Sequence, residues 1–107
     1  MKKYKVTLHP DAEIDINSSF QWGCRTWGRE DAEAWIRKLR HTINTRLTST
    51  PLGCSLAPES NELDIDIREL IVGRYRILFI VENRVVTVLH VKGSYVPQLS
   101  PAEEAVS

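Results

Sequence analysis

The sequence has 107 residues and a formal net charge of zero, because 14 basic side chains balance 14 acidic ones. A chain of this length can bury enough apolar surface to fold as one domain without disulfides. A neutral protein has no general attraction for a polyanion, which counts against nucleic acid as its main partner. The two cysteines, Cys24 and Cys54, are too few for a disulfide framework or a four-ligand zinc site, so we expect small buried thiols.

The N-terminus is charged, and the residues after it never form the apolar run of a signal peptide or of a membrane span. We therefore expect a cytoplasmic protein that is neither exported nor inserted into a membrane.

The first predicted elements are a strand and a helix. Residues 4–8 alternate in polarity as a strand does, and Pro10 suits the first turn of a helix. An apolar stripe then recurs at helical spacing, at Ala12, Ile16, Phe20, Gly23 and Trp27. Gly23 is either a close-packing position or an early break, and Gly28 is the turn into a second helix.

The second helix has the clearest pattern in the chain. Apolar residues recur every three or four positions, at Ala32, Trp35, Ile36, Leu39, Ile43 and Leu47. Acidic residues stand at its start and basic residues further along, as the helix dipole favours. Two amphipathic helices joined by so short a turn must fold back as an antiparallel hairpin, and each then needs an apolar surface on which to pack.

Three strands are predicted after the hairpin. Residues 50–61 have no period and contain two prolines and a glycine, so we expect a loop. Residues 64–71 alternate, with Ile65 and Ile67 on one side and Asp66 and Arg68 on the other. Residues 75–81 and 85–91 are the second and third strands. The strand at residues 75–81 is apolar on both faces, which is typical of the middle of a sheet.

The order strand, helix, helix, strand, strand, strand predicts an α+β domain, in which the helix hairpin packs on one face of a small, mostly antiparallel, twisted sheet. We expect this domain to span residues 1–95, with a C-terminal tail at 96–107. Within the tail, Ser100, Pro101 and Glu103 have the pattern of a helix N-terminus, so a short C-terminal helix is predicted there.

Catalytic and metal-binding motifs are missing from the sequence. No serine or cysteine stands in a glycine-rich elbow, and the three histidines, His9, His41 and His90, lie in unrelated contexts. No metal-ligand spacing occurs, and we interpret Asp64 and Asp66 as a solvated edge of a strand. We therefore expect no metal and no cofactor.

A cationic set around the strands is the one group that could carry a function: Arg68, Arg74, Arg76, His90 and Lys92. Alternation places Arg74 and Arg76 on one side with Leu78 and Ile80, and places His90 and Lys92 on a side with Val86 and Val88. A three-residue loop at 82–84 would set Arg76 opposite His90 and Arg74 opposite Lys92, whereas a two-residue turn would put them on opposite faces.

The sequence leaves this register open. If the loop has three residues, the cationic side chains form a basic surface suited to phosphate or carboxylate. In the alternative interpretation, Arg76 is a structural residue that pairs with an acid such as Glu69.

The segment at 68–82 and the segment at 85–91, with Tyr75-Arg76 in the first and Val88-Leu89-His90 in the second, resemble the signature of the RelE/ParE superfamily of type II toxins. The helical pattern before them, with Trp27, Trp35 and Leu39, resembles the hairpin of the ParE branch. The likeness covers roughly residues 4–93.

The resemblance implies a toxin that a cognate antitoxin holds inactive, and that meets operator DNA only through that antitoxin. ParE-like members inhibit DNA gyrase and have no catalytic residues. RelE-like members cleave mRNA on the ribosome, which here would use Arg68, Arg76 and His90. In either case the resemblance implies that Arg68, Arg74, Arg76, His90 and Lys92 bind the target.

Residue-by-residue comparison favours the ParE branch. Asp66 stands where a RelE-like enzyme would have another lysine. The arginine that such an enzyme commonly has after its last strand is missing, and only Tyr95 lies near that position. A ribonuclease needs several cations to offset phosphate charge. A third alternative is a non-toxic domain that retains only antitoxin binding or DNA autoregulation.

The expected antitoxin-binding residues are Trp27, Trp35 and Leu39. The three tryptophans, counting Trp22, are many for so small a core. We expect core packing for them, and the alternative is that at least one is an interface anchor.

Overall fold

The computed structural model describes residues 3–93, so the predicted tail and its short helix lie outside the described residues. The elements in chain order are β1 (Lys5–Leu8), α1 (Pro10–Trp27), α2 (Arg29–Ser49), the 3₁₀ turn η1 (Pro51–Gly53), α3 (Glu59–Leu63), β2 (Arg68–Val72), β3 (Tyr75–Glu82) and β4 (Val85–Gly93). The predicted α+β order is confirmed, with η1 and α3 added in the connection between α2 and β2.

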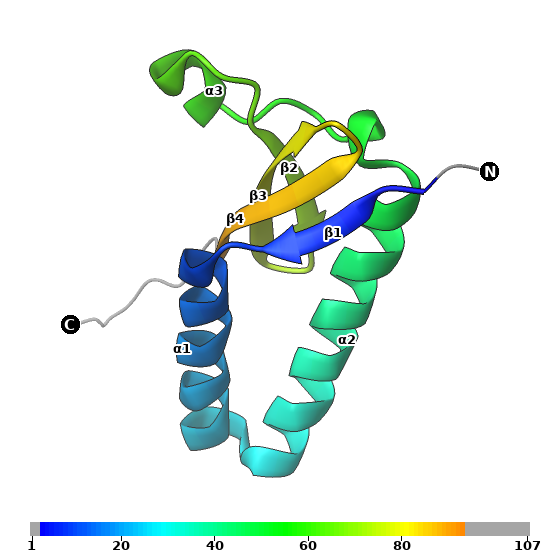
Figure 1. Cartoon of the computed structure of the whole chain (residues 1–107). Helices are drawn as coiled ribbons and strands as arrows, with labels where there is room; N and C mark the ends of the chain where they lie inside the picture. The colour runs from blue at the N-terminus through cyan, green and yellow to red at the C-terminus, as the bar shows by residue number, and fades with distance from the viewer. Residues whose placement is uncertain (1–2, 94–107) are drawn as a thin grey trace.

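The helix hairpin forms as its sequence pattern indicates (Figure 1). The His9 side chain caps α1 by accepting a hydrogen bond from the Asp11 backbone N–H, and Pro10 occupies the first turn. Gly28 alone links the two helices, with φ +97° and ψ 158°, a conformation essentially restricted to glycine. Gly23 is a close-packing position and not a break, because a Cβ there would lie 3.1 Å from the Trp27 ring.

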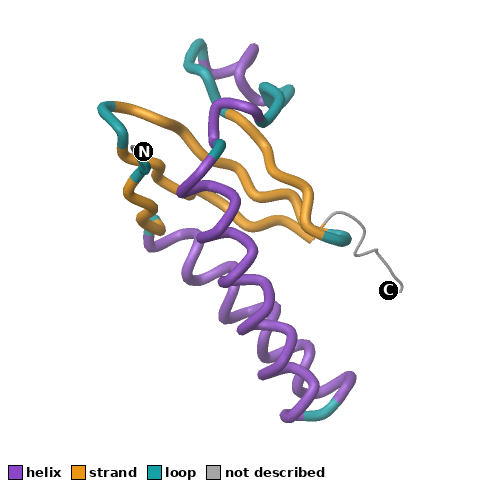
Figure 2. Tube along the Cα trace, turned by 90° about the vertical axis from the view of Figure 1, so that its right-hand side faces the viewer, coloured by secondary structure: helices purple, strands orange, loops and turns teal. Residues whose placement is uncertain are grey.

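The sheet has the strand order β1-β4-β3-β2, in which β1 runs parallel to β4 and the other pairs are antiparallel. Both faces of the central strand β3 are covered, as its apolar pattern predicts. Ile77 and Phe79 pack under the two helices in the main core, whereas Leu78 joins Ala57 and Ile67 in a smaller cluster on the opposite face. Figure 2 shows that the hairpin extends well past the sheet, so its far end has no strand beside it.

The connection between α2 and β2 differs from the prediction. Residues 64–67 are not a strand: Asp64 adopts a left-handed conformation with φ +57° and ends α3. The Ser60 hydroxyl accepts a hydrogen bond from Ile67 N and donates one to Ile67 O, both at 2.7 Å. These bonds replace the strand pairing that the alternation at 64–67 suggested. Asp64 and Asp66 are therefore not neighbours on a strand edge.

Both cysteines are free, and each is half-buried, whereas we expected them to be buried. Partial burial raises the pKa of the Cys54 thiol, against the opposing effect of Arg46 and Arg68.

Candidate functional site

The hairpin of β3 and β4 adopts neither of the two registers considered from the sequence. A two-residue turn at Asn83 and Arg84 pairs Glu82 with Val85, but a β-bulge between Leu78 and Phe79 then shifts the register by one residue. Phe79 pairs with Val88 and Leu78 with His90, so Leu89 has no residue opposite it.

Because of the bulge, Arg76 pairs with Lys92. Directly paired residues point to the same side of a sheet, so Arg76, Lys92 and His90 share the face opposite the helices. The expectation that His90 and Lys92 lie on the side of Val86 and Val88 is therefore wrong. Those two valines are fully buried under the helices.

Arg76 is held by two carboxylates. Its Nε donates to Glu69 Oε1 at 2.9 Å, its Nη2 to Glu59 Oε1 at 2.9 Å, and its Nη1 to Glu59 Oε2 at 3.3 Å. Lys92 Nζ lies 3.7 Å from Glu59 Oε2. We call Arg76, Glu59, Glu69 and Lys92 the Arg76 cluster.

The electrostatics of the Arg76 cluster agree with its geometry. The hydrogen bonds from Arg76 hold the pKa of Glu59 below its ordinary value, and the same bonds, with those to Glu69, raise the pKa of Arg76. The structural pairing of Arg76 with Glu69, one of the two interpretations from the sequence, is present. Glu59 was not foreseen as a partner, although it belongs to an acidic stretch that is visible in the sequence.

Arg68 is also used within the fold. Its Nη1 donates to Cys54 O at 2.7 Å and to Leu52 O at 3.4 Å, which ties the start of β2 to η1. Arg74 lies exposed in the turn between β2 and β3. The structure therefore brings Arg76, His90 and Lys92 to one face and leaves Arg68 and Arg74 separate from them.

His90 lies at an open edge. Strand β1 covers β4 only as far as Val88, and beyond that point Asp15 of α1 takes the place of a neighbouring strand. Asp15 Oδ2 accepts a hydrogen bond from Val91 N at 2.9 Å and lies 3.2 Å from His90 Nδ1. A shallow depression of about 310 Å³ lies beside it, lined by His9, Asp11, Glu59, Ile67, Leu78, Leu89, His90 and Lys92.

The expected antitoxin-binding residues differ in their accessibility. Leu39 is 2% exposed and belongs to the core, so it offers no surface to a partner in this conformation. Trp35 is half-buried against Tyr75, with ring centroids 5.3 Å apart. Trp27 is 43% exposed, and Trp22, which was not in the predicted site, is 46% exposed.

These aromatic rings form a continuous row. Trp22 and Trp27 contact edge to face at 5.2 Å between centroids, and Trp27 and Trp35 do so at 6.1 Å. We call Trp22, Trp27, Trp35 and Tyr75 the aromatic row. The expectation of core packing is wrong for Trp22 and Trp27, because the far end of the hairpin has no sheet to cover it.

Within residues 3–93, no group of three or more histidine, cysteine or acidic side chains is placed to hold a metal ion. None of the helices described there is both long and apolar enough to cross a membrane.

Comparison with solved structures identifies the class of fold. The structure is similar to one described as the chromosomal ParDE TA system from P. aeruginosa, with a TM-score of 0.72 and 12% sequence identity, over 89% of this chain and 100% of that one. At this identity the likeness concerns the fold.

The sequence itself gives the family. Residues 6–94 match the model of the ParE toxin of the type II toxin-antitoxin system parDE, so the chain belongs to the ParE toxin family. None of the curated proteins matches the sequence.

Proposed function

We propose that this ParE-family toxin is a cytoplasmic binding protein that inhibits DNA gyrase and has no catalytic residues of its own. The observation that carries the proposal is that Arg68, Arg76 and His90, which a RelE-like ribonuclease would use, are all engaged within the fold. Stabilising a phosphate in the transition state needs donors aimed at the substrate. Here, the carboxylates of Glu59 and Glu69 surround Arg76 and would repel a scissile phosphate.

Two assays separate gyrase inhibition from mRNA cleavage. Purified protein is added to gyrase with relaxed plasmid, and in parallel to ribosomes translating a defined mRNA. We expect loss of supercoiling with intact mRNA, and recovery of supercoiling when the antitoxin is added. Intact supercoiling together with mRNA cut on the ribosome would refute the gyrase proposal in favour of the ribonuclease alternative.

We further propose that a cognate antitoxin neutralises the toxin by covering the exposed end of the aromatic row, and that operator DNA is met only through the antitoxin. Large exposed aromatics at a surface without its own cover are typical anchors of protein interfaces. An amphipathic segment of the antitoxin could place its apolar side chains on Trp22 and Trp27, with Trp35 behind them.

Replacing Trp27 by alanine tests the antitoxin surface. We expect the antitoxin affinity, measured by calorimetry, to fall by about 2 kcal/mol or more, as for an aromatic hot spot. Ile65→Ala is a matched control, because Ile65 is 49% exposed on a distant segment. Equal affinities of the two variants would place the antitoxin elsewhere.

Under this proposal, fewer of the five residues predicted to bind the target remain candidates for that contact. Arg68 and Arg76 are held within the fold. The side chains of Arg74 and Lys92 lie on the surface, where Lys92 also pairs with Glu59, and His90 lies beside the depression at the edge of β4. We propose that these three contribute to contact with the target.

A further inference from the structure

Positive charge is concentrated in the second half of α2. Residues 34–58 contain no aspartate or glutamate, and the lysines and arginines among them are Arg37, Lys38, Arg40 and Arg46. The chain has no net charge because its acidic residues lie elsewhere in the sequence. A neutral protein can therefore still present a positive surface along this helix.

The exposed polar side chains of this half of α2 gather on one side of the helix. We call the following residues the α2 ridge: Arg37, Lys38, His41, Asn44 and Thr45. A helix turns 100° per residue, so these positions lie within an arc of about 120° and extend over about 12 Å of the axis. All of them are exposed, whereas Leu39, Ile43 and Leu47 on the opposite side are buried.

The α2 ridge leads to two further cations at the end of the helix. Thr48 lies on the same side of α2 as Arg37, because 11 residues turn the helix by about 20° beyond whole turns. Its carbonyl accepts a hydrogen bond from Tyr4 N at 3.0 Å, so the start of the described chain lies beside the last turn of α2 (Figure 1). The guanidinium of Arg84 lies 5.1 Å from the centroid of the Tyr4 ring, and Lys3 is exposed next to Tyr4.

The cations of the α2 ridge are not neutralised within the fold. The side chains of Arg37, Lys38 and His41 make no hydrogen bond or ion pair with any of residues 3–93. Arg40 differs, because its Nη2 lies 2.8 Å from Glu13 Oε1 of α1. The charges of the α2 ridge are thus available to a partner without breaking an internal pair.

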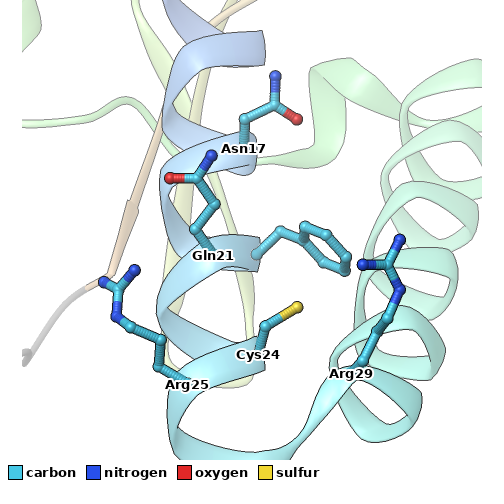
Figure 3. A pocket seen from close by; sticks show the side chains of 6 residues that line it. Asn17, Gln21, Cys24, Arg25 and Arg29 are labelled. Atoms are coloured by element: carbon cyan, nitrogen blue, oxygen red, sulfur yellow. The ribbon is translucent and has the colours of Figure 1, made fainter.

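The acidic residues at the start of α2 leave most of this charge in place. Glu33 is one turn before Arg37, and its Oε2 already accepts a hydrogen bond from Arg29 Nε at 3.1 Å. Figure 3 shows Arg29 at the end of the hairpin. Glu30 and Asp31 precede Arg37 by about 9–11 Å along the axis, which is roughly one Debye length at physiological salt.

The side chains of the α2 ridge are those that contact phosphates. In protein–DNA complexes, phosphate oxygens accept hydrogen bonds mainly from arginine and lysine, and also from asparagine, threonine and serine. A surface about 12 Å long spans three to four base pairs, at about 3.4 Å for each. Lys3 and Arg84 lie beyond its end and would reach further phosphates of the same duplex.

A protein segment fits the α2 ridge less well. Protein interfaces depend on a few large apolar or aromatic anchors that become buried at their centre. Among the described residues of α2, no large apolar side chain is exposed, and those that are exposed belong to other parts of the chain: Ile14, Trp22, Trp27, Leu52, Leu56, Ile65 and Ile71. Protein–DNA interfaces are more polar and more positively charged, as this surface is.

We propose that the α2 ridge, with Lys3 and Arg84 beyond its end, binds the phosphate backbone of duplex DNA, and that this duplex is the one held by gyrase. The source of the duplex rests on the proposed function, in which gyrase is the target. The contact strengthens binding of the toxin to gyrase only while the enzyme holds DNA.

Neutralising two cations of the α2 ridge tests the inference. The double variant Arg37→Gln/Lys38→Gln removes two unpaired charges and keeps good helix formers. The matched control is Lys5→Gln/Arg25→Gln, which removes two exposed charges outside the ridge. Circular dichroism and thermal melting establish that each variant is folded. Binding to a labelled random-sequence duplex of 20 base pairs is then measured by fluorescence anisotropy at several salt concentrations.

We expect the wild type to bind the duplex at low salt and to lose affinity steeply as salt rises. In the ridge variant, the slope of log affinity against log salt should be less steep by about 2, because each phosphate contact contributes about 0.9 to it. The ridge variant should also need at least about tenfold more protein than the wild type to inhibit supercoiling. The control variant should match the wild type in both measurements.

Three results would overturn the inference. The first is a wild type that does not bind the duplex at low salt, or a ridge variant with the salt slope of the control. The second is a ridge variant that loses affinity for gyrase without DNA, which would assign the ridge to the protein surface of the enzyme. The third is a loss of duplex binding with unchanged inhibition of supercoiling, which would exclude the duplex held by gyrase.

The gyrase proposal fails separately. If the wild type leaves supercoiling intact, gyrase is the wrong target. The salt dependence of duplex binding involves no gyrase, so it still decides whether the α2 ridge contacts DNA.

Discussion

Replacing Arg76 by alanine removes three hydrogen bonds to two carboxylates and leaves Glu59 and Glu69 without their shared counter-ion. All three side chains are about one-quarter exposed, at 25%, 25% and 23%. Exposed ion pairs contribute about 0–1 kcal/mol, and breaking a buried pair costs about 3–5 kcal/mol. For this intermediate burial we expect a loss of about 2–3 kcal/mol in the free energy of unfolding.

Thermal melting is the assay for this loss. At roughly 5 °C per kcal/mol for a domain of this size, the melting temperature should fall by about 10–15 °C. Arg76→Lys keeps the charge but not the guanidinium geometry, so it should recover only part of the loss. Arg37→Ala, at an exposed position, should stay within about 0.5 kcal/mol of the wild type. A melting temperature of Arg76→Ala equal to that of Arg37→Ala would refute the structural role of Arg76.

The pH dependence of Glu59→Gln gives an independent check. Since hydrogen bonds from Arg76 lower the pKa of Glu59 in the folded protein, its contribution is fully present above the ordinary glutamate pKa and is lost as the pH falls through the lowered value. The gap in melting temperature between wild type and Glu59→Gln should therefore be largest near neutral pH and should close as the pH falls through the lowered pKa of Glu59. A gap that does not change with pH would mean that Glu59 acts through packing and not through its charge.

Three further substitutions have definite expected outcomes. Gly28→Ala forces a side chain into a glycine-only conformation and should cost about 1–3 kcal/mol in denaturant unfolding. Asp15→Ala should remove the slow hydrogen exchange of the Val91 amide and cost about 1–2 kcal/mol, whereas retained protection would show that Asp15 is dispensable there. Arg84→Ala and Arg84→Gly both lose the contact with the Tyr4 ring at 5.1 Å, but only glycine relieves the strained φ of +64°. Arg84→Ala should therefore melt lower than Arg84→Gly, and the reverse order would contradict the strain at this position.

The helices were predictable because their signals are local. The apolar stripe from Ala32 to Leu47 repeats within the helix that it forms, and Gly28 marks the turn by a conformation that other residues avoid. The double-sided apolar pattern of residues 75–81 likewise predicted a central strand, because such a strand must be covered on both faces.

The register of β3 and β4 could not be predicted, because it depends on pairing between strands. Asn83 and Arg84 both adopt positive φ in a two-residue turn, but the pair is not the Asn-Gly that usually marks one. Nothing in the residues around Leu89 indicates a bulge. One unpaired residue was enough to move His90 and Lys92 to the other face of the sheet.

The partners of Arg76 show how far a site can be predicted from one sequence. Glu69 was foreseen because it is near Arg76 in the chain and on a predicted neighbouring strand. Glu59 was not, because α3 interrupts a stretch without period, and its approach to β3 depends on the Ser60 bonds to Ile67. Acidic residues before the strands were visible, but their distance from Arg76 was not.

The Arg76 cluster sets a physical condition on any catalytic use of this arginine. Glu59 attaches the α3 segment to β3 through Arg76, and Lys92 reinforces that attachment from β4. To place its guanidinium on a phosphate, Arg76 would have to release Glu59, which would give up the ion pairs and free a carboxylate next to the phosphate. Binding RNA there would thus have to offset both the lost pairing and the new repulsion. A protein-binding surface on the helices requires neither, because Trp22 and Trp27 are exposed and carry no charge that would have to be released from a partner.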